Sequence, residues 1–452
     1  MRLRVGIRAL FFSGDSPVGE FVGKKRKFYP LSLHFGSFRS VAFRRMASVS
    51  RSSVGCPRVT SGARARARAR RRRNRGGLFV RVGVASYDDD DVAVANSVDD
   101  DDDGAVAYVV TGGLGFIGTR LCERLVARGA STTVVCVDAV DDEDNGKPYP
   151  NAWKAANAKR LRAIGVDVRE HCDVAVPGNV DKIVRGLVSS GVRVRVAHLA
   201  ARSGVGAAAG DPVGAVRANV GSTAAVLDAA AAASSDVVER VVIASSGSVY
   251  GEASTREDGS PRPSVAGDDS TDSPTSTYAV TKRSAELLGK VYAEQFGVSV
   301  VVARIFTVYG ERGRPDMAVW KFIKQLESGA DLTRFGDGAS TWRDYLHVDD
   351  CCDALERALT CDMAQPYTVV NVAGGKPVYL HEIIDGCEKA CERTGSIREL
   401  PGRPGDVGGT YGDIAATETT LKGWKPRVSL AEGLRRTVAW WRSSEADAYR
   451  EP

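Results

Sequence analysis

Short apolar runs alternate with segments of helical length and pattern from residue 105 onward. The apolar runs are typical of buried strands, and the longer segments between them are typical of helices. We expect strands at 105–111, 132–138, 167–171, 194–201, 240–246 and 298–306. We expect helices at 116–129, 179–189, 213–233 and 277–296. This alternation predicts right-handed βαβ units, and therefore an α/β fold whose parallel sheet is covered by helices on both faces.

Helical patterns dominate the C-terminal third, with only brief strand-like stretches between them. The expected helices are 316–328, 349–360, 380–394 and 429–443. Ser429 and Glu432 have the spacing of a capping box at the start of the last of these helices. We therefore predict a doubly wound parallel sheet over residues 105–310, followed by a smaller mixed α/β lid over residues 311–452.

The N-terminal region differs from this body in charge. Residues 1–86 contain 21 Lys and Arg but only two acidic residues, Asp15 and Glu20. The whole chain of 452 residues has a formal net charge of +6, so the remainder is acidic. Residues 87–104 hold two runs of Asp, whose mutual repulsion keeps a chain extended and predicts a linker. We expect a basic, transit-like disordered segment (1–86) and an acidic linker (87–104) before the body.

The composition of the basic segment predicts a targeting role. It is rich in Arg, Ser, Ala and Gly, as transit peptides are. Met46 begins the stretch MASVSRSSVG, which resembles a plastid transit peptide and offers an alternative start. We expect localisation to the plastid stroma, with the cytoplasm as the alternative. A nucleic-acid-binding arm is the rival interpretation of the arginine run at 63–73, but no aromatic residues interleave with these arginines, which argues against base stacking.

The sequence argues against a membrane anchor and against a zinc site built from cysteines. No apolar run approaches the roughly 18–20 residues needed to span a bilayer, so a membrane anchor is not expected. The nine cysteines are odd in number and include no CxxC pair. Cys387 and Cys391 share a helix face, but no His or second cysteine pair completes a tetrahedral zinc set. We expect reduced, mostly buried thiols and no metal site, as suits a stroma or cytosol.

A glycine-rich turn joins the first expected strand to the first expected helix. Its sequence, TGGLGFIG, places Gly112, Gly115 and Gly118 at GxxGxxG spacing. Glycines here let the backbone approach a pyrophosphate at a helix N-terminus, where N–H groups and the helix dipole favour negative charge. Asp138 ends the second expected strand, 20 residues after Gly118, where a carboxylate can bind an adenosine ribose and would repel a 2′-phosphate. The pattern predicts a Rossmann-type domain that binds NAD rather than NADP.

A serine, a tyrosine and a lysine form the candidate catalytic group. Ser246 ends the fifth expected strand, and Tyr278 and Lys282 lie one helical turn apart in STYAVTK. A phenol with a pKa of about 10 is a poor base at neutral pH. The Lys282 ammonium and the positive nicotinamide ring would lower the pKa of Tyr278 and make it a working base, while Ser246 would hydrogen-bond the reacting hydroxyl. The three residues predict hydride transfer between NAD and a substrate hydroxyl.

Together, the glycine spacing and these three residues resemble the extended short-chain dehydrogenase/reductase superfamily of NAD-dependent epimerases and dehydratases. The resemblance implies that Asp173 and Val174 flank the adenine and that HLAA at 198–201 lines the cofactor channel. It also implies a homodimer formed through helices 213–233 and 277–296. The residues expected to contact the cofactor are Gly112, Gly115, Phe116, Ile117, Gly118, Asp138, Asp173, Val174, Leu199, Ala200, Ala201, Tyr278 and Lys282.

The segment ARIFTVYGERGRPDMAVWKF at 303–322 resembles the matching part of UDP-glucuronate 4-epimerases. The resemblance implies that Thr307 and Arg314 meet the sugar carboxylate and that Arg343 binds the diphosphate, with residues 311–452 mainly binding the nucleotide sugar. A planar guanidinium suits a carboxylate because it can donate two charge-assisted hydrogen bonds. The alternative is a turn arginine paired with a local acid such as Asp316. The substrate-binding residues implied are Ser246, Thr307, Arg314 and Arg343.

The reaction implied by this resemblance is the reversible 4-epimerisation of UDP-glucuronate to UDP-galacturonate through a 4-keto intermediate, by an isomerase that retains NAD. Ser248 stands where dehydratases and UDP-glucuronate decarboxylases usually carry Glu, which favours an epimerase. Gly206 in place of a basic residue and Gly247 within a run of hydroxyls depart from the family pattern and leave other substrates open. The alternatives are a UDP-glucose/UDP-galactose 4-epimerase, another nucleotide-sugar epimerase, a decarboxylase and a non-catalytic plastid protein that binds NAD or RNA.

Overall fold

The structure is a computed structural model that describes residues 105–140, 149–233, 237–252, 254–402 and 407–450. The basic segment 1–86 and the acidic linker 87–104 lie outside the described residues, as does Cys56. The interpretations of these segments therefore stay predictions.

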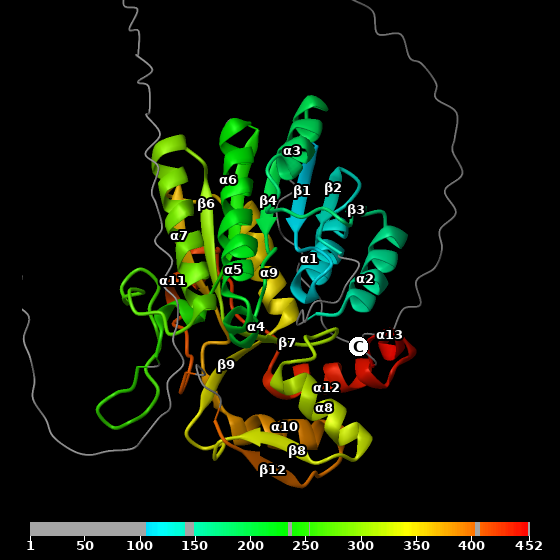
Figure 1. Ribbon diagram of the computed structural model, residues 1–452, viewed down its shortest axis with the longest axis vertical. Helices are drawn as coiled ribbons and strands as arrows, with labels where there is room; N and C mark the ends of the chain where they lie inside the picture. The colour runs from blue at the N-terminus through cyan, green and yellow to red at the C-terminus, as the bar shows by residue number, and fades with distance from the viewer. Residues whose placement is uncertain (1–104, 141–148, 234–236, 253, 403–406, 451–452) are drawn as a thin grey trace, which may run out of the picture. The chain divides into compact units, whose positions relative to one another are not determined.

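A seven-stranded parallel sheet forms the centre of the described region (Figure 1). Its strand order is β10-β6-β5-β4-β1-β2-β3. The strands are β1 (Val106–Thr111), β2 (Thr132–Val137), β3 (Asp167–Arg169), β4 (Arg193–His198), β5 (Val238–Ser246), β6 (Val300–Ile305) and β10 (Tyr367–Val372). β1 and β6 are buried along their whole length, as parallel strands are when helices cover both faces. Six of the seven strands were predicted, and the α/β class with a doubly wound parallel sheet is confirmed.

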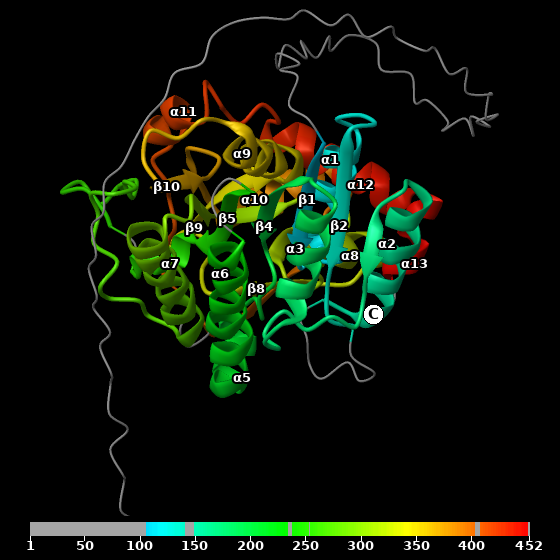
Figure 2. The same cartoon turned by 90° about the horizontal axis from the view of Figure 1, so that it is seen from above.

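Helices cover both faces of this sheet (Figure 2). One face carries α3 (Asn179–Ser189), α6 (Ser222–Ala232) and α7 (Thr277–Phe296), and the other carries α1 (Phe116–Val126), α2 (Asn151–Ala163) and α9 (Val348–Thr360). Each face has its own cluster of buried apolar residues. Helix α2 was not predicted, whereas the ranges of α3 and α7 agree with the predicted helices.

The predicted helix 213–233 is interrupted. It begins as α5 (Pro212–Val216), which follows the short helix α4 (Val205–Gly210), and continues as a π-helical turn (Arg217–Gly221) before α6. Pattern alone predicts a continuous helix here, because a π-turn adds one residue without changing the local composition.

Most of the remaining elements form a smaller group, which we call the C-terminal lobe (Figure 1). β7, β9 and β11 make a three-stranded sheet in the order β11-β9-β7, and β8 pairs with β12. The hydroxyl of Ser429 caps α12 as predicted, but the carboxylate of Glu432 pairs with Arg435 and Arg436. The elements of the lobe are β7 (Thr307–Tyr309), α8 (Ala318–Ser328), β8 (Leu332–Phe335), β9 (Trp342–His347), β11 (Pro377–Tyr379), α10 (Leu380–Cys391), β12 (Ile397–Leu400), α12 (Leu430–Arg442) and α13 (Asp447–Arg450). The short helix α11 (Ala415–Thr420) packs instead on β10, at the edge of the main sheet.

The predicted boundary at residue 310 does not separate the main sheet from the lobe. β10, within the predicted domain 311–452, pairs with β6 at the edge of the main sheet, and α9 packs on that sheet. β7, within the predicted domain 105–310, belongs to the three-stranded sheet of the lobe. These exchanges are long-range pairings, which local periodicity does not reveal.

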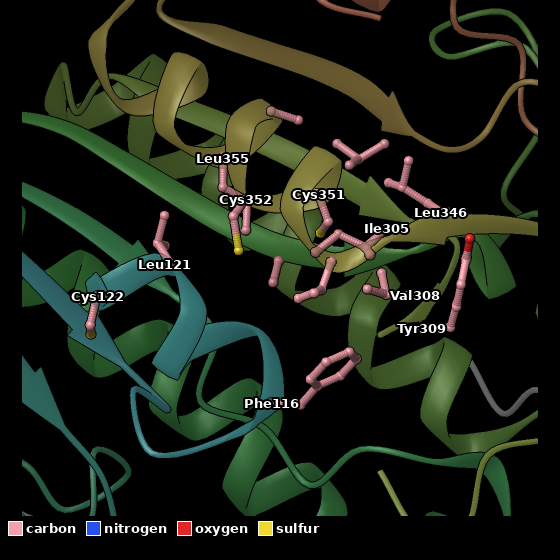
Figure 3. Packing of buried hydrophobic residues seen from close by; sticks show 14 of the residues in the cluster. Phe116, Leu121, Cys122, Ile305, Val308, Tyr309, Leu346, Cys351, Cys352 and Leu355 are labelled. Carbon is pink, nitrogen blue, oxygen red and sulfur yellow. The ribbon is translucent and has the colours of Figure 1, made fainter. Parts of the chain in front are cut away.

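One apolar core runs from the main sheet into the C-terminal lobe (Figure 3). Phe116 and Leu121 of α1, Ile305 of β6, Leu346 of β9 and Leu355 of α9 all belong to it. Because only Phe306 separates β6 from β7, the lobe begins at the carboxyl edge of the sheet, where α/β proteins bind ligands.

Charged and polar contacts join the C-terminal helices to the first two helices. Arg312, in the turn after β7, is 5% exposed and binds Glu123 of α1 at 3.0 Å and Glu445 at 2.6 Å. The hydroxyl of Tyr449 donates to the side-chain oxygen of Asn157 in α2 at 2.6 Å. The end of the described chain is thereby attached to the helices that follow β1 and β2.

Candidate functional site

The glycine-rich turn between β1 and α1 has no room for side chains at two of its predicted glycines. Gly112 has a φ of +71°, and a Cβ there would lie 2.7 Å from the backbone nitrogen of Ala200. A Cβ on Gly118 would collide with the backbone of the same turn. Phe116 and Ile117 begin α1, whose first turn holds no acidic residue to compete with an anion. The turn therefore fits the pyrophosphate of NAD.

Asp138 follows β2 directly and is 6% exposed. Its carboxylate accepts hydrogen bonds from the N–H of Leu114 at 2.9 Å and from the ammonium of Lys154 at 2.8 Å. Lys154 also donates to the carbonyl of Ala139 at 2.8 Å. The structure thus places the predicted ribose-binding carboxylate beside the turn that contains Gly115. Lys154 was not predicted as a site residue, because its helix, α2, was not predicted.

The HLAA segment lies against the end of β1. The N–H of Leu199 donates to the carbonyl of Thr111 at 3.0 Å, and the N–H of Ala200 donates to the hydroxyl of Thr111 at 3.3 Å. Ala201 continues the segment along the carboxyl edge of the sheet. These bonds bring the predicted wall of the cofactor channel next to the glycine-rich turn.

The two residues predicted to flank the adenine differ in exposure. Val174 is 4% exposed and belongs to the apolar core. The carboxylate of Asp173 accepts a hydrogen bond from the N–H of Ala175 at 2.9 Å and pairs with Arg217 at 3.0 Å. The side chain of Asp173, rather than that of Val174, is therefore the one that can face a ligand.

The candidate catalytic residues meet between β5 and α7. The hydroxyl of Ser246 lies near that of Tyr278 and acts to lower the pKa of the phenol. The ammonium of Lys282 lies 5.8 Å from the centroid of the Tyr278 ring and donates to the carbonyl of Ala244 at 2.8 Å. The structure brings together the three side chains that the sequence assigned to catalysis.

Burial changes the pKa of both titratable residues in this group. It raises the pKa of Tyr278, an effect partly offset by the charge of Arg314 and by the hydrogen bond with Ser246. It lowers the pKa of Lys282 to about 8. In the chain alone, burial has the largest effect on the pKa of Tyr278 and outweighs the charge of Arg314. The expectation that Lys282 and the nicotinamide ring together lower this pKa stays a prediction. The positive nicotinamide ring can lower the pKa of Tyr278 only when the cofactor is bound.

His198, at the end of β4, is a buried titratable residue near Lys282. Its Nδ1 lies 2.8 Å from the hydroxyl of Thr111, and its Nε2 lies 3.1 Å from that of Thr223. Burial and the charge of Lys282 lower the pKa of His198 to about 3. The imidazole is therefore neutral at physiological pH, and it links β4 to β1 and α6.

Asn219 lies in the π-helical turn and was not predicted as a site residue. Its side-chain oxygen accepts from the N–H of Arg202 at 2.6 Å, and its amide nitrogen donates to the hydroxyl of Thr281 at 2.8 Å. Thr281 lies on α7 between Tyr278 and Lys282. The sequence held a signal for an irregular turn here, because asparagine is a weak helix former and Asn219 interrupts an alanine-rich helix.

The two residues after Ser246 shape its surroundings. The hydroxyl of Ser248 donates to the hydroxyl of Ser246 at 3.0 Å. A Cβ on Gly247 would lie 2.9 Å from the ring of Phe306. The ring occupies the space that a side chain at position 247 would need, so the departure from the family pattern noted at Gly247 has a packing reason.

A cavity of about 450 Å³ lies among β7, α8, β8 and β9. Its volume is in the usual range for small-molecule sites. Thr307, Arg314 and Arg343 all line it. Ser246 and Tyr278 are not among its lining residues, but the charge of Arg314 acts on Tyr278, so the cavity adjoins the catalytic group.

The arginines of the cavity region have protein partners in this structure. Arg314 donates two hydrogen bonds to Asp316, at 3.0 and 2.6 Å, which is the local pairing considered as an alternative. Arg343 donates to the carbonyls of Trp342 at 2.8 Å and Val407 at 3.0 Å. A ligand that takes up the Nε and Nη2 of Arg314 together, as a carboxylate can, replaces Asp316.

The geometry agrees with the result of comparison with known proteins. Residues 108–373 match the model of the NAD dependent epimerase/dehydratase family. The chain belongs to this family. The matched range begins within β1, ends just after β10 and contains Ser246, Tyr278 and Lys282.

Similar members of the family act on UDP-sugars, according to their names. The UDP-glucuronate 4-epimerase of Thermodesulfobacterium geofontis is 31% identical over 74% of this chain and 95% of its own length. The structure of UDP-glucuronic acid 4-epimerase from Bacillus cereus in complex with UDP-glucuronic acid and NAD has a TM-score of 0.63 and 31% identity, covering 74% of this chain and 98% of that chain. The structure of Thermus thermophilus UDP-glucose 4-epimerase with NAD has a TM-score of 0.60 and 27% identity, covering 75% and 100%.

This family member has eight cysteines within the described residues, all free. Seven are buried, and Cys172 is half-buried. Among the described residues, no group of three His, Cys, Asp or Glu side chains is arranged to hold a metal ion. No helix in the described part of the chain has the length and apolar character required to span a bilayer.

Proposed function

We propose that the chain catalyses the NAD-dependent 4-epimerisation of UDP-glucuronate to UDP-galacturonate through a 4-keto intermediate. The observation that carries this proposal is the position of Arg314, which lines the cavity with Thr307 and Arg343 and lies within electrostatic reach of Tyr278. A guanidinium beside the catalytic tyrosine suits a sugar whose carboxylate is attached to C5, next to the reacting C4. The relatives named for UDP-glucuronate support the same substrate.

The side chains of the catalytic group supply proton transfer at the sugar hydroxyl. NAD, when bound, would accept a hydride from C4 and return it to the opposite face of the sugar. Tyr278 takes the proton of the C4 hydroxyl and later returns it. Ser246 orients that hydroxyl, and Ser248 fixes the hydroxyl of Ser246 by donating to it at 3.0 Å. Lys282 is charged below its pKa of about 8 and then favours the phenolate of Tyr278.

The cavity residues keep the sugar in position in both orientations of the 4-keto intermediate. Arg314 and Thr307 bind the sugar carboxylate, which keeps C4 next to Tyr278 in both orientations of the 4-keto sugar. Arg343 binds the diphosphate after leaving the carbonyl of Val407. Ser248 provides a hydroxyl where a decarboxylase or dehydratase would need a carboxylic acid, so the substrate retains its carboxylate.

Proton NMR of the purified full chain incubated with UDP-glucuronate, without added cofactor, tests this function. We expect UDP-galacturonate to form. Tyr278→Phe abolishes turnover because it removes the base. Arg314→Ala reduces kcat/KM strongly, because loss of a charge-assisted pair with a carboxylate costs about 1.5–3 kcal/mol, or roughly 10- to 150-fold.

Other products would identify a different function. Formation of UDP-xylose or a 4-keto pentose would indicate a decarboxylase. Interconversion of UDP-glucose and UDP-galactose without turnover of UDP-glucuronate would indicate an epimerase of neutral sugars. Arg314 would then have only a structural role, as the partner of Asp316 in its turn. NAD binding without turnover of any nucleotide sugar would indicate a binding protein.

We also propose that the chain is a homodimer formed through α5 and α7. Six of the nine large hydrophobic residues exposed among the described residues lie on these two helices. They are Val213, Val216, Val280, Leu287, Val291 and Phe296. Burial of such a surface against a second copy is favourable at about 25 cal/mol per Å². Leu287→Asp is expected to convert the dimer to a monomer in analytical ultracentrifugation.

We further propose that residues 1–86 direct the protein to the plastid stroma. The support is compositional: a basic, Ser- and Ala-rich segment nearly free of acidic residues. Fusing residues 1–104 to a fluorescent protein should send that protein to plastids in plant cells. A cytoplasmic signal would contradict the proposal, and persistence of 63–73 in the mature protein would favour the nucleic-acid-binding interpretation.

A further inference from the structure

The carboxylate-binding arginine of the proposed site is occupied by a carboxylate of the chain itself. Nε of Arg314 lies 3.0 Å from one oxygen of Asp316, and Nη2 lies 2.6 Å from the other. Both residues line the 450 Å³ cavity. This two-bond geometry is the one in which a guanidinium binds a free carboxylate.

The two partners differ in how firmly they are held. The side chain of Arg314 is 20% exposed, whereas that of Asp316 is 43% exposed. Among the described residues, the structure shows no hydrogen bond of the Asp316 carboxylate other than those with Arg314. Asp316 is therefore the partner that can turn toward solvent while Arg314 stays at the cavity wall.

We infer that Asp316 is a specificity-determining residue that occupies Arg314 until the carboxylate of a uronic acid displaces it. This inference rests on the proposed function and assigns a role to a residue that the reaction itself does not require. The exchange replaces one carboxylate by another, so Arg314 is paired in the free protein and in the complex. Only the identity of its partner changes.

The exchange affects charged sugars but not neutral ones, because only a charged sugar competes with Asp316 for Arg314. A UDP-sugar with a hydroxymethyl group at C5 has no charge with which to displace Asp316, so Arg314 stays turned to its own aspartate. A UDP-uronate gains the two bonds of Arg314 but must compete for them. Asp316 should therefore weaken the binding of uronates and leave that of neutral sugars unchanged.

Isothermal titration of the full-length chain in its NAD-saturated form, carrying Tyr278→Phe to prevent turnover, tests the inference. The titrants are UDP-glucuronate and UDP-glucose, and the variants are Asp316→Asn and Asp316→Glu. Asp316→Asn is expected to tighten UDP-glucuronate binding about twofold to fivefold, the factor that corresponds to an exposed ion pair. Its affinity for UDP-glucose stays the same, and Asp316→Glu retains the affinity of the unsubstituted chain for both.

The chain offers a matched control at the start of β3. Asp167 pairs with Arg169, also two residues away, through two hydrogen bonds of 3.1 and 2.8 Å, and both side chains are exposed. Neither residue lines the cavity. Asp167→Asn removes an equivalent pair, and we expect no change in affinity for either nucleotide sugar.

Each other outcome has a defined meaning. Weaker UDP-glucuronate binding in Asp316→Asn would show that Asp316 positions Arg314 and would overturn the inference, as would equal changes for both sugars or no change at all. If the unsubstituted protein epimerises UDP-glucuronate in these cases, the proposed function stands and only the inference fails. If neither the unsubstituted protein nor Asp316→Asn binds UDP-glucuronate, both fail.

Discussion

Replacement of Glu286 by alanine would remove the centre of a buried charge network beneath the candidate site. Glu286 lies on α7 and is fully buried. Its carboxylate accepts two hydrogen bonds from Arg304, each 2.9 Å long, and one from the hydroxyl of Ser245 at 2.5 Å. Arg283 adds a contact at 3.1 Å. The network joins the catalytic helix to β5 and β6.

The expected loss of stability follows from the burial of Arg304. Arg304 is 5% exposed, and Glu286→Ala would leave its charge without a counter-ion. Breaking one partner of a buried pair costs about 3–5 kcal/mol. Arg304 keeps its hydrogen bond to the hydroxyl of Tyr250 at 3.0 Å, which places the expected loss near the lower end of that range. The loss is large against typical total stabilities of about 5–15 kcal/mol.

Urea denaturation followed by circular dichroism measures this loss. The midpoint should fall while the slope m stays constant, since the same surface is exposed on unfolding. Glu294→Ala on the same helix is the matched control. Glu294 pairs with Lys290 at 3.9 Å and both side chains are exposed, so its loss should change stability by about 0.5 kcal/mol or less. A loss for Glu286→Ala no larger than that of the control would refute the argument that this network holds α7 in place.

Three further substitutions test individual contacts. Gly247→Ala should destabilise the chain by about 1–3 kcal/mol in urea denaturation because its Cβ would lie 2.9 Å from the ring of Phe306, and an unchanged midpoint would contradict this packing. Lys154→Ala should increase the loss of NAD from the protein, measured as the cofactor that separates from it during gel filtration, because Asp138 loses the partner that holds it at 2.8 Å. Equal retention of NAD would show that Lys154 does not support the ribose site. The pKa of Lys282 is lowered by burial to about 8 from an ordinary value of 10.5, so the folded chain releases this proton before the unfolded chain does. The free energy of unfolding of the unsubstituted chain, relative to Lys282→Met, should therefore rise between pH 8 and pH 10.5, and a flat or falling difference would contradict the assigned burial.

Local pattern was sufficient for most of the main sheet. β1 is an almost continuous apolar run because both of its faces are buried, and β6 is apolar except for Arg304. The glycine-rich turn between β1 and α1 follows from its spacing. β10 has a similar apolar pattern but was not assigned to this sheet. Its partner, β6, lies more than 60 residues earlier, and periodicity within a segment carries no information about such a pairing.

The candidate site shows the same division between local and long-range information. Tyr278 and Lys282 share a helix face by spacing alone, and Ser246 ends a recognisable strand. The direction in which the pKa of Tyr278 shifts in the chain alone depends on burial by the whole fold, which the spacing of residues does not reveal. The pairing of Arg314 with Asp316 could be named from the sequence, but its place on a cavity wall required the structure.

The ion pairs of Arg312 bear on the order in which the protein is made. Glu123 is translated early, whereas Glu445 and Tyr449, near the end of the described chain, are translated more than 300 residues later. Until then, Arg312 and Asn157 lack the partners that hold them at 2.6 Å in the finished molecule. A nascent chain therefore cannot complete the surroundings of its first two helices before its final turns have been translated. A chain that ends before Glu445 would lack one of the two carboxylates that pair with Arg312.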